Sequence, residues 1–262
     1  MVRLLAAIGS RVTALLSFVG QTVSLLFQAL FYIVRARLKL GLTINQMSEV
    51  GVNSLPIALV TILFSGMVWC YYLVQQAVKY QGMQFVGWAV AEAVFRELGP
   101  VLTAVVVAAR AGSAMTAELG TMTVTEQVDA LRTLAVDPVH YLVVPRLVAA
   151  VIMLPIVTLF ADLAGIGGGY IVAMTEGAAT GSIGASVYLS SISSNVTLWV
   201  VGAGLLKTLF FGMTIATLAC YYGLRCEKGA EGVGRAVMKC VVVCIVVVYV
   251  SDYFLTKLLY PY

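Results

Sequence analysis

Residues 50–78 read VGVNSLPIALVTILFSGMVWCYYLVQQAV and contain no charged side chain. A helix needs about 20 predominantly apolar residues to cross the hydrocarbon core of a bilayer, so this run predicts a membrane span. The composition agrees, because 61% of the 262 residues are hydrophobic and 11% are charged. A soluble domain has about 45–50% apolar residues and about 25% charged residues. These values exclude a soluble globular enzyme, a disordered chain and a small secreted domain held by disulfides.

Four more apolar runs predict spans on the C-terminal side of the first. They cover residues 84–109, 147–175, 197–224 and 240–259. Between the third and fourth spans, residues 177–195 are rich in Gly, Ser, Ala and Thr, which favours a loop with one short helix. The sequence therefore predicts an all-α polytopic membrane protein.

The N-terminal segment allows two interpretations. Residues 12–34 carry no charge and are long enough to cross. Their polar residues, however, recur along one helical face, which is typical of a helix that lies in the membrane interface. That face consists of Ser10, Ser17, Gln21, Ser24 and Gln28. We favour the interfacial helix and divide the chain into residues 1–45, the interfacial segment, and 46–262, the membrane domain.

The basic residues predict the orientation. With five spans and a cytoplasmic N-terminus, twelve of the sixteen lie inside, Lys79 and Lys257 lie outside, and Arg96 and Lys207 lie within spans. The twelve are Arg3, Arg11, Arg35, Arg37, Lys39, Arg110, Arg132, Arg146, Arg225, Lys228, Arg235 and Lys239. Short cytoplasmic loops of membrane proteins carry such an excess of Lys and Arg. A six-span chain would place Arg3 and Arg11 outside and weaken the bias.

The 110–146 loop is then cytoplasmic and holds a predicted helix. Residues 123–132 have mixed charge at helical spacing, and Asp137-Pro138 is a stop signal. An ordered helix on this side suits the docking of a soluble partner, although a solvated surface helix would show the same pattern.

The chain lacks the residues of common catalytic sites. It has no GxxxxGK[ST] loop for nucleotide phosphates and one histidine, His140. The five cysteines have no metal-type pairing and are expected to be buried and reduced. The net charge of +4 is too small to favour nucleic acid. We therefore expect no catalytic residue, no metal site and no cofactor in this chain.

Charged residues inside the predicted spans form the first candidate site. They are Glu92, Arg96, Glu97, Asp162, Lys207 and Asp252. Charges in a membrane usually face the bundle interior or a wet cavity and pair with opposite charges. Glu92 and Arg96 have the favourable i,i+4 spacing, and Lys207 and Asp252 lie in adjacent spans. These pairs could hold helices in register or form the polar floor of a substrate cavity.

A stripe in the first span forms the second candidate site. Trp69, Tyr72, Gln76 and Tyr80 share one helical face, and Leu63 and Val74 are expected to point outward instead. An interfacial aromatic belt would explain Tyr80. It explains Trp69 poorly, because that residue lies about 16 Å deeper along the helix.

Four motifs, in order, closely resemble the MlaE/YrbE family of ABC-transporter permeases, which move lipids together with MCE-domain proteins. The motifs are FRELGP at 95–100, ARAGSAMTAELG at 109–120, TEQ at 125–127 and LAVDP at 134–138. The resemblance covers residues from about 45 to the C-terminus, and the N-terminal segment matches in character only.

The resemblance implies an assembly in the bacterial inner membrane with a cytoplasmic N-terminus. It implies a homodimer whose subunits each have an interfacial helix and five spans around an outward-opening phospholipid cavity. The expected partners are an ABC ATPase that holds ATP and magnesium, a small STAS-domain protein and a periplasmic MCE-domain hexamer. Lipid would move between the inner membrane and the MCE protein and so maintain outer-membrane lipid asymmetry.

The resemblance also assigns residues. Trp69, Gln76, Ala77, Tyr80 and Leu98 would line the lipid cavity, and Arg96, Glu97, Lys207 and Asp252 would be the intramembrane charges. A coupling helix at about 121–136 would dock the ATPase. From the pattern of this segment we expect Glu126, Gln127, Asp129, Arg132 and Asp137 to take part. Trp69 and Gln76 depart from the family's often aliphatic cavity, and His140 and Tyr141 stand where basic residues are usual.

Two other functions fit the charges. An ion-coupled secondary transporter could relay protons or sodium through Asp162, Lys207 and Asp252, and a membrane-embedded lipid-modifying enzyme could use the carboxylates as acids or bases. Neither needs a cytoplasmic docking helix, and inverted repeats typical of secondary transporters are not evident. The docking helix therefore favours the ATP-driven permease.

Overall fold

The computed structural model describes residues 2–35, 39–80, 82–179 and 184–260, which are helical throughout apart from short turns. Arg37 lies outside the described residues, as do the side chains of Arg3 and Arg11. The first half of the chain forms α1 (Val2–Val34), α2 (Leu40–Met47), η1 (Ser48–Val52), α3 (Leu55–Tyr80), η2 (Met83–Phe85), α4 (Val86–Ala93), η3 (Val94–Leu98), α5 (Gly99–Val107), η4 (Ala108–Gly112) and α6 (Ser113–Val124). The second half forms α7 (Gln127–Thr133), η5 (Val139–Val143), α8 (Val144–Ala179), α9 (Ala185–Asn195), α10 (Leu198–Leu224) and α11 (Ala230–Leu259).

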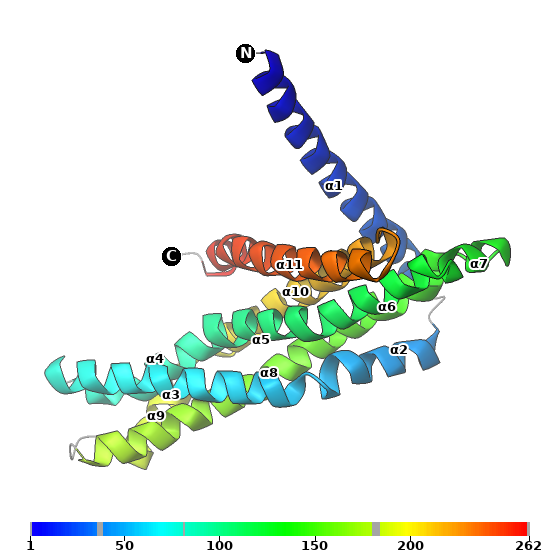
Figure 1. Cartoon of the computed structure of the whole chain (residues 1–262). Helices are drawn as coiled ribbons and strands as arrows, with labels where there is room; N and C mark the ends of the chain where they lie inside the picture. The colour runs from blue at the N-terminus through cyan, green and yellow to red at the C-terminus, as the bar shows by residue number, and fades with distance from the viewer. Residues whose placement is uncertain (1, 36–38, 81, 180–183, 261–262) are drawn as a thin grey trace.

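Six helical stretches of the described residues are long and apolar enough to cross a membrane. Five belong to the bundle, and the sixth covers Val12–Val34 in α1, where 6% of the apolar window is buried. Figure 1 shows α1 slanting away from the bundle, in contact with it only near its C-terminal half. The chain is an all-α polytopic membrane protein.

Several helices are longer than the apolar runs predict. The second span does not end near 109, because π-helical turns carry the helix on from Met83 to Val124. The last helix begins at Ala230, ten residues before its apolar run. Polar residues continue these helices beyond the hydrocarbon core, where hydropathy no longer marks them. The Gly/Ser/Ala/Thr-rich stretch does contain one short helix, α9, and residues 180–183 lie outside the described residues.

Glycines bring α3 and α8 into close contact. A Cβ on Gly66 would lie 2.1 Å from the Gly165 backbone oxygen, and one on Gly168 would lie 2.4 Å from the Leu63 oxygen. Small residues at such crossings let backbones approach where lipid supplies no hydrophobic drive for association. Gly165, Gly168 and Gly169 therefore serve helix packing, whereas Gly167 has no neighbour within 4 Å.

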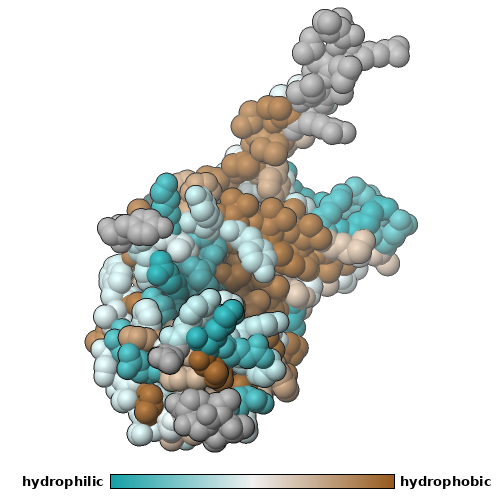
Figure 2. Space-filling model, turned by 90° about the vertical axis from the view of Figure 1, so that its left-hand side faces the viewer, coloured by the Kyte–Doolittle hydropathy of each residue, from teal (hydrophilic) through white to brown (hydrophobic). Residues whose placement is uncertain are grey.

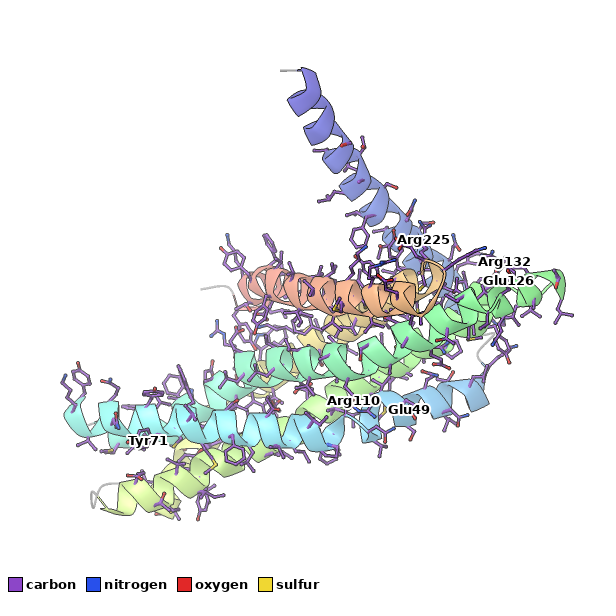
Figure 3. The ribbon with its side chains drawn as sticks, viewed as in Figure 1. Glu49, Tyr71, Arg110, Glu126, Arg132 and Arg225 are labelled. Carbon is purple, nitrogen blue, oxygen red and sulfur yellow. The ribbon has the colours of Figure 1, made fainter. Side chains whose placement is uncertain are left out.

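The bundle has two chemically different ends. One, here the α7 end, carries α7 and the junction of α10 and α11; the other, the α9 end, carries α9 and the C-terminus of α3 (Figure 1). Figure 2 looks at the α9 end, where polar residues gather, with an apolar surface rising toward α1. Nearer the α7 end, Arg110 Nη1 donates to the Glu49 backbone oxygen at 2.8 Å and ties η4 to η1 (Figure 3).

Candidate functional site

Lys207 on α10 is enclosed by oxygen atoms of η3 and α11. Its side chain is 0% exposed, and Nζ lies 2.9 Å from Asp252 Oδ1 and 3.2 Å from Glu97 Oε1. Nζ also donates to Thr256 Oγ1 at 2.6 Å and to the Arg96 backbone oxygen at 2.9 Å. The Thr256 hydroxyl donates to Glu97 Oε1 at 3.1 Å. We call these five residues the Lys207 cluster; its contacts satisfy a buried charge that would otherwise be very costly.

The sequence of η3 explains why the Arg96 carbonyl is available. In an α-helix this oxygen would accept a hydrogen bond from the N–H four residues on, but that residue is Pro100, which has no N–H. A π-helical turn precedes Pro100 at Val94–Leu98. A carbonyl without a hydrogen-bond donor costs on the order of several kcal/mol within a membrane. Lys207 Nζ supplies the donor that the Arg96 carbonyl would otherwise lack.

The Arg96 side chain points to a different set of partners. Its Nη1 lies 3.6 Å from Glu92 Oε1, and its guanidinium carbon lies 4.0 Å from the centre of the Tyr260 ring. Tyr260 lies just past the end of α11, and burial raises the pKa of its phenol to about 12. The Tyr260 hydroxyl donates to the Val200 backbone oxygen at 3.0 Å. Glu92 and Arg96 thus join the Lys207 cluster only through the Arg96 backbone.

Asp162 on α8 lies apart from these charges. Its side chain is 2% exposed, and Oδ1 has no hydrogen-bond partner among the described residues. A Cβ on Gly99 would lie 1.6 Å from this oxygen and 2.9 Å from the Val94 backbone oxygen, so a larger residue there would displace the Asp162 carboxyl group. Asp162 packs against the turn that follows η3 and does not contact Lys207 or Asp252, with which the relay interpretation grouped it.

The aromatic stripe lies on an exposed flank of α3. Trp69, Tyr72, Gln76 and Tyr80 are all exposed, so large side chains stand on the surface from mid-helix to the α9 end. The two aliphatic residues assigned with this stripe to the lipid cavity do not lie on the exposed flank. Ala77 is buried in the core cluster of α3, α4 and α8, and Leu98 packs half-buried against that cluster.

The opposite flank of α3 is also exposed. Val60, Phe64 and Tyr71 lie there, and Tyr71 projects from the helix in Figure 3. With about 3.6 residues per turn, Tyr71 points roughly opposite to Trp69. The expectation that Leu63 and Val74 point outward is wrong, because Val74 is 3% exposed and Leu63 is half-buried beside Gly168. Both residues lie on or beside the face of α3 that α8 covers.

The predicted coupling helix is shorter than 121–136. Residues 121–124 complete α6, and α7 spans only Gln127–Thr133. Glu126 before it and Ala135 after it adopt positive φ values of 60° and 56°, which end the helix on both sides. Buried Val128 anchors α7 to the core, whereas Leu134 is 73% exposed.

The polar residues assigned to this segment divide into two groups. Glu126, Gln127, Asp129 and Arg132 are exposed, and Asp129 and Arg132 pair with each other at 2.8 Å. Asp137 instead accepts hydrogen bonds from the Tyr32 hydroxyl of α1 and from the Val139 N–H. Asp137 therefore holds the end of the loop against α1, and the outward surface of α7 consists of the other four residues and Leu134.

Sequence reasoning missed Thr256 and Tyr260. Asp252 and Thr256 are four residues apart and share a face of α11, and Tyr260 follows four residues later at the C-cap of that helix. This spacing of a carboxylate, a hydroxyl and a phenol in an apolar segment could have predicted that all three lie near Lys207. The described residues contain no group of three or more His, Cys, Asp or Glu side chains that could hold a metal ion.

The sequence matches a known family over most of its length. Residues 43–258 match the family described as Permease MlaE. The chain is 40% identical over 233 residues to a probable ABC transporter permease protein of Synechocystis, covering 89% of this chain and 87% of that protein. It is 37% identical over 254 residues to one of Rickettsia felis, covering 97% and 96%. It is 34% identical over 260 residues to the intermembrane phospholipid transport system permease protein MlaE of Haemophilus influenzae, covering 99% and 98%. The chain belongs to the MlaE permease family.

Proposed function

We propose that this chain is the membrane-embedded permease subunit of an ATP-driven phospholipid transporter. The observation that carries the proposal is its near full-length match to a permease named for intermembrane phospholipid transport. An ABC permease is not itself catalytic, so ATP and magnesium would bind to a separate ATPase. This assignment takes precedence over the secondary transporter and the lipid-modifying enzyme.

The distribution of basic side chains supports a cytoplasmic α7 end. Basic residues that the structure describes near that end are Lys39, Arg132, Arg225, Lys228, Arg235 and Lys239. Lys79 and Lys257 are the ones near the α9 end. The positive-inside rule then puts the α7 end and the N-terminus in the cytoplasm of a bacterial cell and the α9 end in the periplasm.

The exposed flank of α3 is the proposed lipid contact. Trp69 lies deep enough to meet acyl chains, while Gln76 and Tyr80 lie nearer the α9 end and would meet a head group. In a homodimer, two such flanks would face each other across an outward-opening cavity. A periplasmic MCE-domain hexamer would receive or deliver the lipid there, in a system that maintains outer-membrane lipid asymmetry.

The outward surface of α7 is the proposed ATPase contact. Exposed charges and Leu134 project beyond the bundle, while Val128 fixes the helix to α6 and the rest of the core. Motion of the ATPase would thereby reach the long α5–α6 helix, whose other end carries η3 and the Lys207 cluster. A small STAS-domain protein would bind to the ATPase rather than to this chain.

Reconstitution tests the proposal. The full-length chain and the ATPase that co-purifies with it, identified by its phosphate-binding loop, are placed in vesicles that contain a fluorescent phospholipid. We expect ATP-dependent movement of the lipid and loss of that movement with a catalytically inactive ATPase. Transport that needs an ion gradient and no ATPase would overturn the proposal.

A further inference from the structure

A polar groove separates α1 from the bundle at the α7 end. Its volume is about 410 Å³. Gln21, Ser24 and Gln28 of α1 form one wall, and Arg225 at the end of α10 forms the other, with Arg132 of α7 at the rim. Figure 3 shows Arg225 and Arg132 at this end, where the C-terminal half of α1 meets the bundle.

The apolar and polar faces of α1 have different surroundings. Its apolar side chains Val19, Val23 and Phe27 are exposed, whereas its polar stripe borders the groove. Phe18 packs edge-on against Tyr221 of α10, with ring centres 5.1 Å apart, and fixes this orientation. Three residues of the polar stripe, Gln21, Ser24 and Gln28, therefore border a hollow that also contains Arg225.

The charge of Arg225 has no carboxylate counterpart. Its guanidinium donates to Gln21 Oε1 and lies 4.9 Å from the centre of the Tyr221 ring. The Tyr221 hydroxyl donates to the same Gln21 oxygen at 3.1 Å. No carboxylate oxygen of a described residue lies within 4.0 Å of Arg225. Arg235, near the start of α11, differs because it pairs with both Glu227 and Glu231.

The rest of the groove is apolar. Leu25, Val139 and Leu224 line it beside the polar groups. A cationic rim with hydroxyl and amide donors above an apolar wall fits a phosphate group that is attached to an acyl chain. Arginine suits this role because its planar fork binds phosphate oxygens in pairs.

We infer that the groove binds an anionic phospholipid of the cytoplasmic leaflet, with the phosphate at Arg225 and an acyl chain along Leu25 and Leu224. Arg132 also lines the groove, but it pairs with Asp129 and is not needed for this contact. The inference rests on the orientation proposed above. The site is distinct from the α3 flank and lies at the other end of the bundle. A bound head group would connect α1 and α10, and so place the lipid of this leaflet beside the segment proposed to dock the ATPase.

Binding can be measured as the rise in Tm of the purified full-length chain in detergent. The probes are dihexanoyl-phosphatidylglycerol, dihexanoyl-phosphatidylcholine and inorganic phosphate at equal concentrations. We expect the first to raise Tm and the other two to do so far less. Arg225→Gln should weaken the apparent affinity for phosphatidylglycerol about fivefold or more, and Arg225→Lys should retain part of it.

Matched variants separate this site from general charge and from misfolding. Arg235→Gln removes the same charge from the same end of the molecule and should leave binding unchanged. Gln28→Glu places a negative charge in the groove from the exposed surface of α1 and should weaken binding even where Arg225→Gln fails to fold. Thr13→Glu, an exposed position nearer the N-terminus of α1 and outside the groove, is its control.

Three results would overturn the inference. They are equal stabilisation by phosphatidylglycerol and phosphatidylcholine, equal stabilisation by inorganic phosphate, and equal losses in Gln28→Glu and Thr13→Glu. The measurement uses no ATPase and no transport, so a failure here would leave the proposed function standing, and a failure of ATPase docking would leave this result unchanged.

Discussion

Lys207 Nζ and Asp252 Oδ1 lie 2.9 Å apart across α10 and α11, and the lysine is entirely enclosed. Glu97, Thr256 and the carbonyl that Pro100 leaves available complete the shell. This arrangement ties the second, fourth and fifth spans of the bundle together at one polar point. Two features of the RELGP sequence therefore build the cluster: Pro100 leaves the Arg96 carbonyl available to Lys207, and Glu97 supplies a carboxylate.

Breaking the Lys207–Asp252 pair should destabilise the protein strongly. Removal of one partner of a buried ion pair leaves an uncompensated charge and costs about 3–5 kcal/mol. Lys207→Ala and Asp252→Ala should each lower Tm in detergent, and the double variant should be no worse than the more harmful single one. Strictly additive losses would show that the two residues do not interact.

Charge reversal on α7 should release the ATPase. Glu126→Lys combined with Asp129→Lys changes the exposed surface without touching buried Val128, so the permease should keep its Tm. Co-purification of the ATPase is the measurement. Glu231→Lys, an exposed change at the same end, is the control. A complex of unchanged composition in the α7 variant would contradict the proposed contact.

Leu134 should contribute an apolar anchor to the same contact. Leu134 is 73% exposed, so the described residues leave most of its side chain uncovered. Leu134→Ser should weaken ATPase binding about tenfold, the usual effect of losing a buried aliphatic side chain worth about 1.5 kcal/mol. Thr133→Ser, on the neighbouring exposed position, should have little effect. Equal affinities of the two variants would remove Leu134 from the interface.

The crossing of α3 and α8 should tolerate no side chain at Gly66. An added Cβ meets a backbone oxygen at 2.1 Å, so the helices must separate. Gly66→Ala should destabilise the protein by about 1–3 kcal/mol, the range for overpacked cores. Gly202→Ala on α10 has no neighbour within 4 Å and should be neutral or stabilising. Similar Tm values for the two variants would show that the crossing is not tight.

Much of this fold could be predicted from composition and charge alone. Apolar runs located the five bundle spans, and Lys207 and Asp252, a cation and a carboxylate in adjacent spans, do lie in contact. The ends of the helices were harder to predict from the sequence. The limits of α7 depend on positive φ values at Glu126 and Ala135, and neither residue type signals such a conformation.

The direction in which helical faces point could not be predicted either. The polar stripe predicted an interfacial helix but not its neighbours: Gln21, Ser24 and Gln28 border the groove with Arg225, and Phe18 packs on Tyr221 beside them. Hydropathy likewise could not distinguish Val74, which α8 covers, from Phe64 and Tyr71, which it does not. In a chain this apolar, lipid-facing and core-facing residues have the same composition, so packing decides the difference.

The most direct test of the central claim compares the two exposed flanks of α3 in the assembled transporter. A photo-crosslinking amino acid at position 69 or 76 should capture phospholipid, and ATP should change the yield because the cavity changes during transport. The same group at 64 or 71, equally exposed on the opposite flank, should label bulk lipid at a yield that ATP does not alter. Equal, ATP-independent labelling of all four positions would mean that the Trp69 flank is ordinary bilayer contact and would contradict the proposed lipid path.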